Sequence, residues 1–309
     1  MLEIIFIFIC SVALVIKGAT FSTKYAAKLA DGFGLSRYAI GFIVVAVISI
    51  LPETFVAVSS ALAGMSSFGL GTLFGSNVAD MTLVFAVILL LAGRGIKIES
   101  KILKKNKVYP FLLLLPLIFG FDGFFSRTEG LALIVFGIVF YYTAFRDGST
   151  AIRLNGNVGS ETKNILLFLL GMAVLIIGSH FTVTSAANFA NFLNVNPILV
   201  GMLLVGLGTT MPELLFALNA IKKRDDDLAV GDILGTVLAD ATIVIGILAL
   251  INPFSFPLKM IYITGAFMVA ASVLLFIFMY TGRVLSRKEG IALLFFWLTF
   301  VVVEFMVNR

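Results

Sequence analysis

Ten runs of apolar residues, separated by polar or glycine-rich breaks, limit how this chain can fold more than any other feature. A run that crosses a bilayer must pair its own backbone polar groups, and runs of this length favour helices. The 309 residues are 60% hydrophobic and 13% charged, too apolar for a soluble core. The sequence therefore predicts an all-α integral membrane protein with ten transmembrane helices, at 3–22, 38–63, 70–92, 108–121, 129–145, 164–187, 196–221, 229–251, 258–280 and 288–307.

Composition excludes several other readings of the chain. The first run lacks a basic region at its start and carries Glu3, so we interpret it as a spanning helix and not as a signal peptide. Cys10 is the one cysteine, which excludes disulfides and thiolate metal sites within one chain. Most basic residues lie in short connections between apolar runs, which indicates membrane topology and no nucleic-acid partner.

A shift of 160 residues aligns the chain with itself. The stretch SRTEGLAL at 126–133 matches SRKEGIAL at 286–293 at six of eight positions. We therefore expect a first five-helix repeat at 1–145, a linker at 146–162 and a second five-helix repeat at 163–309. The same shift, without a gap, pairs Gly18 with Gly178, Phe21 with Phe181, Gly41 with Gly201, Pro52 with Pro212, Glu53 with Glu213, Gly75 with Gly235, and Asp80 with Asp240.

An odd number of helices per half predicts that the second half is inverted in the membrane. The distribution of basic residues agrees, because connections that are basic in one half are nearly free of lysine and arginine at the equivalent place in the other. The face poor in basic residues holds only Arg127, Lys259 and Arg309. The linker is therefore expected in the cytoplasm and both termini outside.

Four acids fall well inside the apolar runs, as two pairs with the same internal spacing: Glu53 with Asp80, and Glu213 with Asp240. A central acid costs about 2.5–3.5 kcal/mol to insert, and no lysine or arginine lies deep in a run to neutralise these. One interpretation is that the acids are protonated and only hydrogen-bond between helices. The repeat favours another, in which all four meet near the midplane and bind a cation.

The residues around the acids suit a hard divalent ion. Calcium takes six to eight oxygens from carboxylates, carbonyls and hydroxyls. Pro52 and Pro212 each remove a helical hydrogen bond and so free a carbonyl about one turn earlier. The sequence thus predicts an ion site with no resident cofactor, formed by the four acids and by the hydroxyls of Ser49, Ser76, Thr209, Thr210 and Thr236.

Several carboxylates around one Ca²⁺ would retain it unless other cations neutralise the acids when it leaves. Competition of this kind predicts secondary active antiport by alternating access, in which either Na⁺ or protons replace Ca²⁺ on the acids. The expected setting is multi-pass in the cell membrane, with small inorganic cations and the lipid bilayer as partners and no obligate protein partner.

Two motif pairs resemble a known group. ISILPE at 48–53 with GSNVAD at 75–80, and GTTMPE at 208–213 with GTVLAD at 235–240, are similar to the two alpha-repeats of the cation/calcium exchanger superfamily, especially prokaryotic sodium/calcium exchangers. The resemblance covers essentially the whole chain. It implies that Glu53 and Glu213 are central calcium ligands and that Asp80 and Asp240 complete the site. It also implies that the first and sixth helices slide to switch access.

The first repeat departs from the family pattern, which reads Gly-Thr-Ser-x-Pro-Glu. Ile48 and Ile50 replace two of its residues, and an isoleucine cannot ligate Na⁺. The repeat also ends in Asp80, where asparagine is common in sodium/calcium exchangers. The resemblance implies exchange of Ca²⁺ for Na⁺. Because a further carboxylate can take a proton, a Ca²⁺/H⁺ exchanger is the alternative.

An enzyme of another class, the intramembrane aspartyl protease, also places two aspartates on neighbouring helices. Its Gly-x-Gly-Asp signature is absent, since Ala-Val-Gly precedes Asp232 and Val-Leu-Ala precedes Asp240. We therefore expect no enzyme. Asp232 is interpreted either as lining the cytoplasmic entrance or as an acid that stabilises a helix N-terminus. Glu304 is expected at the membrane interface, and His180 is expected to be structural or pore-lining.

Overall fold

The computed structural model describes residues 2–30, 49–98, 109–148, 161–282 and 284–308. Within these ranges, seven helices are long and apolar enough to cross a membrane, and Leu51–Leu62 and Tyr109–Phe119 are shorter apolar helices. The chain is therefore an all-α integral membrane protein, with a few two-residue strands between its helices.

The described elements fall into two series. The first series is α1 (Leu2–Ala30), α4 (Leu51–Leu62), α5 (Ser66–Ala79), the π-helical turn η3 (Asp80–Val84), α6 (Phe85–Leu91), β1 (Ile96–Lys97), α8 (Tyr109–Leu112), α9 (Leu115–Phe119), β2 (Phe124–Phe125) and α10 (Arg127–Gly148). The second is α11 (Glu161–Leu193), α12 (Pro197–Val200), η5 (Gly201–Val205), α13 (Gly206–Lys222), α14 (Asp226–Ala239), η6 (Asp240–Val244), α15 (Ile245–Ile251), β3 (Phe254–Ser255), η7 (Met260–Gly265), α16 (Ala266–Gly282), β4 (Val284–Leu285) and α17 (Arg287–Asn308).

Equivalent elements in the two series start 160 residues apart, as α5 and α14, η3 and η6, α6 and α15, and α10 and α17 all do. The predicted helix at 38–63 is described only from residue 49, and most of the predicted linker at 146–162 also lies outside the described residues. The predicted helix at 108–121 is broken into α8 and α9, because Pro116 sits in the first turn of α9 and has no N–H to continue the helix.

The repeated octapeptide forms the same local structure twice. In the first copy, the N–H of Ser126 donates to Glu129 Oε2 at 2.8 Å, and the N–H of Glu129 donates back to Ser126 Oγ at 3.3 Å. Ser286 and Glu289 make the same reciprocal pair in the second copy. These are capping boxes, which satisfy free N–H groups where α10 and α17 begin.

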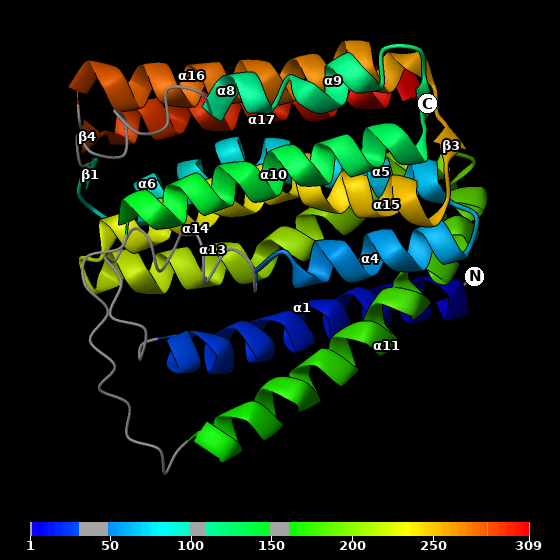
Figure 1. Cartoon of the computed structure of the whole chain (residues 1–309), viewed down its shortest axis with the longest axis horizontal. Helices are drawn as coiled ribbons and strands as arrows, with labels where there is room; N and C mark the ends of the chain where they lie inside the picture. The colour runs from blue at the N-terminus through cyan, green and yellow to red at the C-terminus, as the bar shows by residue number, and fades with distance from the viewer. Residues whose placement is uncertain (1, 31–48, 99–108, 149–160, 283, 309) are drawn as a thin grey trace.

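Helices α1 and α11 form a closely packed pair at one edge of the molecule (Figure 1). A Cβ added at Gly18 would lie 2.7 Å from the backbone nitrogen of Leu175, and one added at Gly178 would lie 2.8 Å from that of Val15. The two backbones can approach this closely only because glycine has no side chain.

Short antiparallel strands join the two series at both ends of the molecule. β1 pairs with β4, and β2 pairs with β3. Figure 1 shows β1 and β4 at the left-hand end and β3 at the right-hand end, where α1 begins and α17 ends. We refer to these as the β1–β4 end and the β2–β3 end.

An ion pair also joins the two series at the β1–β4 end. Arg94 follows α6 and binds Asp226, the first residue of α14, through two hydrogen bonds of 2.6 and 2.7 Å, and the N–H of Lys97 donates to the same carboxylate at 3.0 Å. The hydrogen bonds to Asp226 raise the pKa of Arg94, so the guanidinium stays charged.

Replacing Arg94 with glutamine is expected to lower the free energy of unfolding by about 1 kcal/mol, because the bidentate pair is partly exposed and screened. Thermal unfolding in detergent, followed through the fluorescence of Trp297, measures this. Lys223→Gln is the control, since it removes one positive charge from an exposed side chain at the same end. Equal destabilisation of the two variants would contradict a specific role for the pair.

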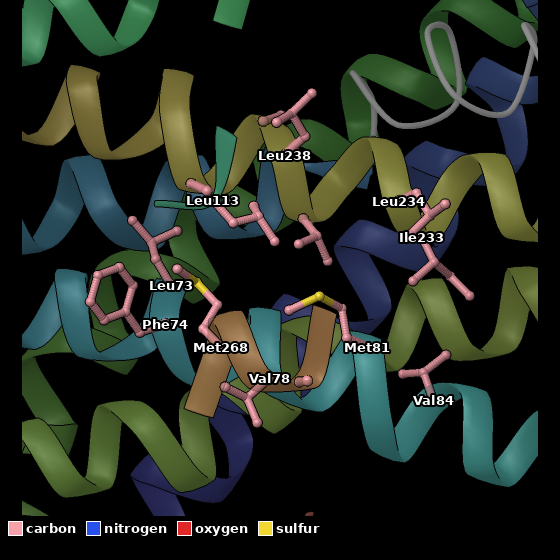
Figure 2. Packing of buried hydrophobic residues seen from close by; sticks show 14 of the residues in the cluster. Leu73, Phe74, Val78, Met81, Val84, Leu113, Ile233, Leu234, Leu238 and Met268 are labelled. Atoms are coloured by element: carbon pink, nitrogen blue, oxygen red, sulfur yellow. The ribbon is translucent and has the colours of Figure 1, made fainter. Parts of the chain in front are cut away.

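The interior holds both an apolar core and many polar side chains. Figure 2 shows apolar side chains from α5 and η3 facing those of α14, with Leu113 and Met268 between them. Outward faces are apolar instead, with Phe6 68% and Phe295 65% exposed. A surface of this kind fits lipid, and the buried polar groups point to function inside.

Candidate ion-binding site

The two glutamates each lie on a helix directly after a proline. Glu53 is in the first turn of α4, and Glu213 is in the middle of α13 after Pro212. Because Pro212 has no N–H, it cannot donate to the carbonyl of Gly208, which would be its partner in a regular helix. The helix continues through this point, so a backbone oxygen with a free lone pair lies one turn from Glu213.

The two aspartates each occupy the first position of a π-helical turn. Asp80 begins η3 and Asp240 begins η6. A π-helical turn interrupts the ordinary pattern of backbone hydrogen bonds, and such turns are frequent at functional sites. The hydroxyls of Thr82 and Thr242 each donate to a carbonyl four residues earlier, Val78 and Leu238, and so supply donors where the pattern changes.

All four acids are fully buried. The side chains of Glu53, Asp80, Glu213 and Asp240 are 0% exposed, and none of their carboxylate oxygens has a hydrogen-bond partner among the described residues. A buried carboxylate without a partner is costly, so each of these oxygens is available to a ligand.

Acids from the two series lie close enough for their charged forms to repel one another. This holds for Glu53 with Asp80, Glu213 and Asp240, and for Asp80 with Glu213 and Asp240. The ion pair that the described residues do form, Arg94–Asp226, is at the β1–β4 end of the molecule. The structure therefore brings the four sequence-predicted acids into one electrostatically connected group.

The four acids alone do not form a complete metal site. Within the described ranges, no three histidine, cysteine or acidic side chains converge closely enough to hold a metal ion. An ion shared by the four would therefore also need hydroxyl or carbonyl oxygens, or a closing movement of the helices.

The five predicted hydroxyl ligands fall into two kinds. Thr210 and Thr236 have buried hydroxyls without a hydrogen-bond partner among the described residues, and Thr210 lies beside Asp80. The other three are engaged: Ser76 donates to Leu73 O at 3.0 Å, Thr209 to Gly206 O at 3.0 Å, and Ser49 to Asp232 Oδ1 at 2.9 Å. A hydroxyl that donates keeps its lone pairs, so all five remain possible ligands.

Asp232 is the residue that sequence reasoning underrated. It lies in α14, is 0% exposed, and interacts electrostatically with Glu53, Asp80 and Glu213. The available signal was its spacing of eight residues from Asp240, which puts both on a similar face of one helix. A role limited to the helix N-terminus does not fit its burial beside the other acids.

Two other expectations concern residues outside this group. Glu304 is buried within the protein near the end of α17 and accepts hydrogen bonds of 2.6 Å from Thr264 and from Asn308, and its interfacial depth in the membrane stays a prediction. His180 is exposed on α11 and contacts the ring of Phe181 edge-on. Of the two isoleucines in the first motif, Ile50 is buried and Ile48 lies outside the described residues.

Comparison with known proteins gives a family-level match to most of the chain. A family model described as sodium/calcium exchanger protein matches residues 3–146 and again residues 163–306. The two matched ranges are themselves 160 residues apart.

Individual relatives cover much of their own length as well. The sodium/calcium exchanger MaX1 of Methanosarcina acetivorans is 25% identical, with 97% of this chain and 98% of that protein covered. The inner membrane protein YrbG of Escherichia coli is 27% identical over 79% of each chain. A solved structure of the sodium-calcium exchanger NCX_Mj has the same fold, with a TM-score of 0.74 at 23% identity over 98% of this chain and 99% of that one.

Proposed function

Since this chain belongs to the sodium/calcium exchanger protein family and is a cation/calcium antiporter of the membrane, we propose that it exchanges Ca²⁺ for Na⁺ at the buried acidic group. It is a transporter and not an enzyme. Ca²⁺ and Na⁺ are its substrates, bound in turn and released unchanged.

One observation carries the proposal: Glu53, Asp80, Glu213 and Asp240 are buried, lack partners among the described residues, and come from both series. Each would cost about 2.5–3.5 kcal/mol as an isolated charge in a membrane. Bound cations remove most of this cost, because they neutralise the negative charge of the buried carboxylates. The acids that attract Ca²⁺ therefore also need another cation after Ca²⁺ leaves.

Exchange follows from this competition. A group with several unneutralised carboxylates is too costly to move past an apolar barrier, whereas the same group neutralised by Ca²⁺ or by Na⁺ is not. The protein then changes its facing only with ions bound, and each Ca²⁺ that leaves is replaced. Protons could neutralise the same acids, so a Ca²⁺/H⁺ exchanger is the alternative that the experiment below separates.

The proposed setting is ten transmembrane helices in two inverted five-helix repeats, 1–145 and 163–309, with the acids near the membrane midplane. Three findings support it: the matched element positions, the two family-model matches at the same shift, and the strands that join the series at both ends. The charge pattern of the sequence supports a cytoplasmic linker at 146–162 and termini outside the cell membrane.

The pair α1–α11 is the element we propose to move when access switches. Close packing at Gly18 and Gly178, and the hydrogen bond of 3.2 Å between Ser11 and Ser185, make the two helices one unit. α1 and α11 also lie against α13 and α4, which carry Glu213 and Glu53. Sliding of this unit would open the glutamates first to one side and then to the other.

Radioactive calcium flux tests the function and its coupling ion. Purified protein in liposomes loaded with Na⁺ is expected to take up ⁴⁵Ca²⁺ when diluted into Na⁺-free medium, and to take up little when the loaded salt is K⁺ at equal concentration. A pH gradient without Na⁺ is the third arm. Uptake driven only by the pH gradient would replace Na⁺ with H⁺ as the coupling ion, and no uptake in any arm would exclude antiport of Ca²⁺.

A further inference from the structure

Asp232 gives the site a fifth carboxylate that the repeat does not duplicate. Its equivalent under the shift of 160 residues is Thr72, on α5. Asp232 is fully buried, and its Oδ2 has no hydrogen-bond partner among the described residues, while Oδ1 accepts from Ser49. A lone buried carboxylate oxygen without a partner needs either a cation or a proton.

The pair Ser49–Asp232 has an uncharged counterpart on the other side of the acids. The equivalents of its two residues are Thr209 and Thr72, and both hydroxyls are satisfied by carbonyls of their own helices, at 3.0 and 3.1 Å. A Cβ added at Gly206 would lie 3.0 Å from the carbonyl oxygen of Thr72, which places this region of α13 against α5. One side therefore holds a carboxylate where the other holds only hydroxyls.

The helix positions show which side carries the charge. α14 begins at the β1–β4 end, where Asp226 binds Arg94. Asp232 precedes Asp240 by eight residues on this helix, so it lies about 12 Å closer to that end, at 1.5 Å of rise per residue. Thr72 holds the corresponding position in α5, which begins near the opposite end, where Ser67 donates to Ser255 O at 2.9 Å.

The side that gains a carboxylate is also the side that lacks a hydroxyl. Thr210 presents an unpartnered hydroxyl beside Asp80, but its repeat equivalent is Ile50, whose side chain has no oxygen. Ser49 alone, being neutral, would hold a cation weakly. The Oδ2 of Asp232 supplies an oxygen on that side, together with a full negative charge.

We propose that Asp232, together with Ser49, binds a monovalent cation on the β1–β4 side of the four acids, and so gives this side a higher affinity for Na⁺ than the opposite side. This rests on the proposed function. No three acidic side chains among the described residues converge closely enough to hold a metal ion, so this position offers one carboxylate and one hydroxyl, fewer oxygens than Ca²⁺ takes, which favours Na⁺. The site is asymmetric because Thr72 cannot contribute a charge.

Binding of ²²Na⁺ to the purified protein tests the cation site directly. Asp232→Asn keeps the size of the side chain and an oxygen that accepts from Ser49, and removes only the charge. We expect its Na⁺ affinity to fall about tenfold. Thr72→Val, which removes the equivalent hydroxyl, is the matched control and is expected to bind like the wild type. If Asp232 only ties two helices together, Asp232→Asn binds Na⁺ unchanged, and the proposal is wrong.

Flux from each face tests the asymmetry. Na⁺ is titrated outside right-side-out and everted vesicles, and the half-saturating concentration for Na⁺-dependent ⁴⁵Ca²⁺ flux is compared. Asp232→Asn is expected to raise the half-saturating Na⁺ concentration about tenfold at one face only. Equal increases at both faces would overturn the assignment to one side. The two proposals fail separately, because wild-type protein without Ca²⁺ flux refutes exchange, whereas ²²Na⁺ binding still decides the role of Asp232.

Discussion

Replacing Glu213 with glutamine is expected to reduce calcium exchange at least about a hundredfold, because loss of one carboxylate from a buried cation site costs about 3 kcal/mol. Folding should persist, since ionised Glu213 would repel ionised Glu53 and Asp80, and a neutral glutamine removes that repulsion. The measurement pairs ⁴⁵Ca²⁺ flux with thermal unfolding. In Glu213→Gln, added Ca²⁺ should raise the melting temperature less than in the wild type.

Glu304→Gln is the matched control for this prediction. Glu304 is also a fully buried carboxylate in a membrane helix, but it accepts hydrogen bonds from Thr264 and Asn308 and is not one of the four acids. We expect it to retain calcium exchange and to lose some stability, because one of its accepting oxygens becomes an amide donor. Normal flux in Glu213→Gln would remove Glu213 from the ion site.

Replacing Gly75 with alanine is expected to have the largest structural effect. Its Cβ would overlap the carbonyl oxygen of Met202 and lie 2.7 Å from the carbonyl carbon, so α5 and η5 would have to separate. Overpacking against backbone costs about 3 kcal/mol or more. Gly75 precedes Ser76 and lies one helical turn before Asp80, so the shift would also move this side of the ion site away from α13 and abolish exchange.

Gly208→Ala provides the comparison for stability. A Cβ at Gly208 would approach only Cγ1 of Val12, at 2.7 Å, and the end of a side chain can move. Thermal unfolding in detergent should therefore show a much larger decrease for Gly75→Ala than for Gly208→Ala. Similar decreases in both variants would mean that α5 and η5 can separate at little cost, and that the close approach at Gly75 is not required.

The parts of this molecule that follow from local chemistry could be predicted from sequence. The capping boxes in the repeated octapeptide follow from local sequence, because Ser126 with Glu129, and Ser286 with Glu289, have the spacing of a capping box at a helix start. The four acids stood out for a related reason, since an ionisable group in an apolar run is costly and needs a partner or a function.

Other features depend on contacts that no single segment reveals. The π-helical turns at Asp80 and Asp240 arise within runs that read as ordinary helix, and nothing in their composition marks the extra residue per turn. The position of Asp232 beside Ser49 depends on how α14 packs against the segment before α4, a contact between residues 183 positions apart. Its spacing from Asp240 puts it on a similar face of α14, but the contact with Ser49 could not be predicted from that helix alone.

The strands that close both ends of the molecule restrict how it can work. Strand pairing links the two halves of the chain at opposite ends, through β1 with β4 and through β2 with β3. The ion pair Arg94–Asp226 is a further link. Rocking of one half against the other would break the strand pairing at one end of the molecule or at the other. α1 and α11 take part in none of these links, which agrees with the proposal that this pair moves when access switches.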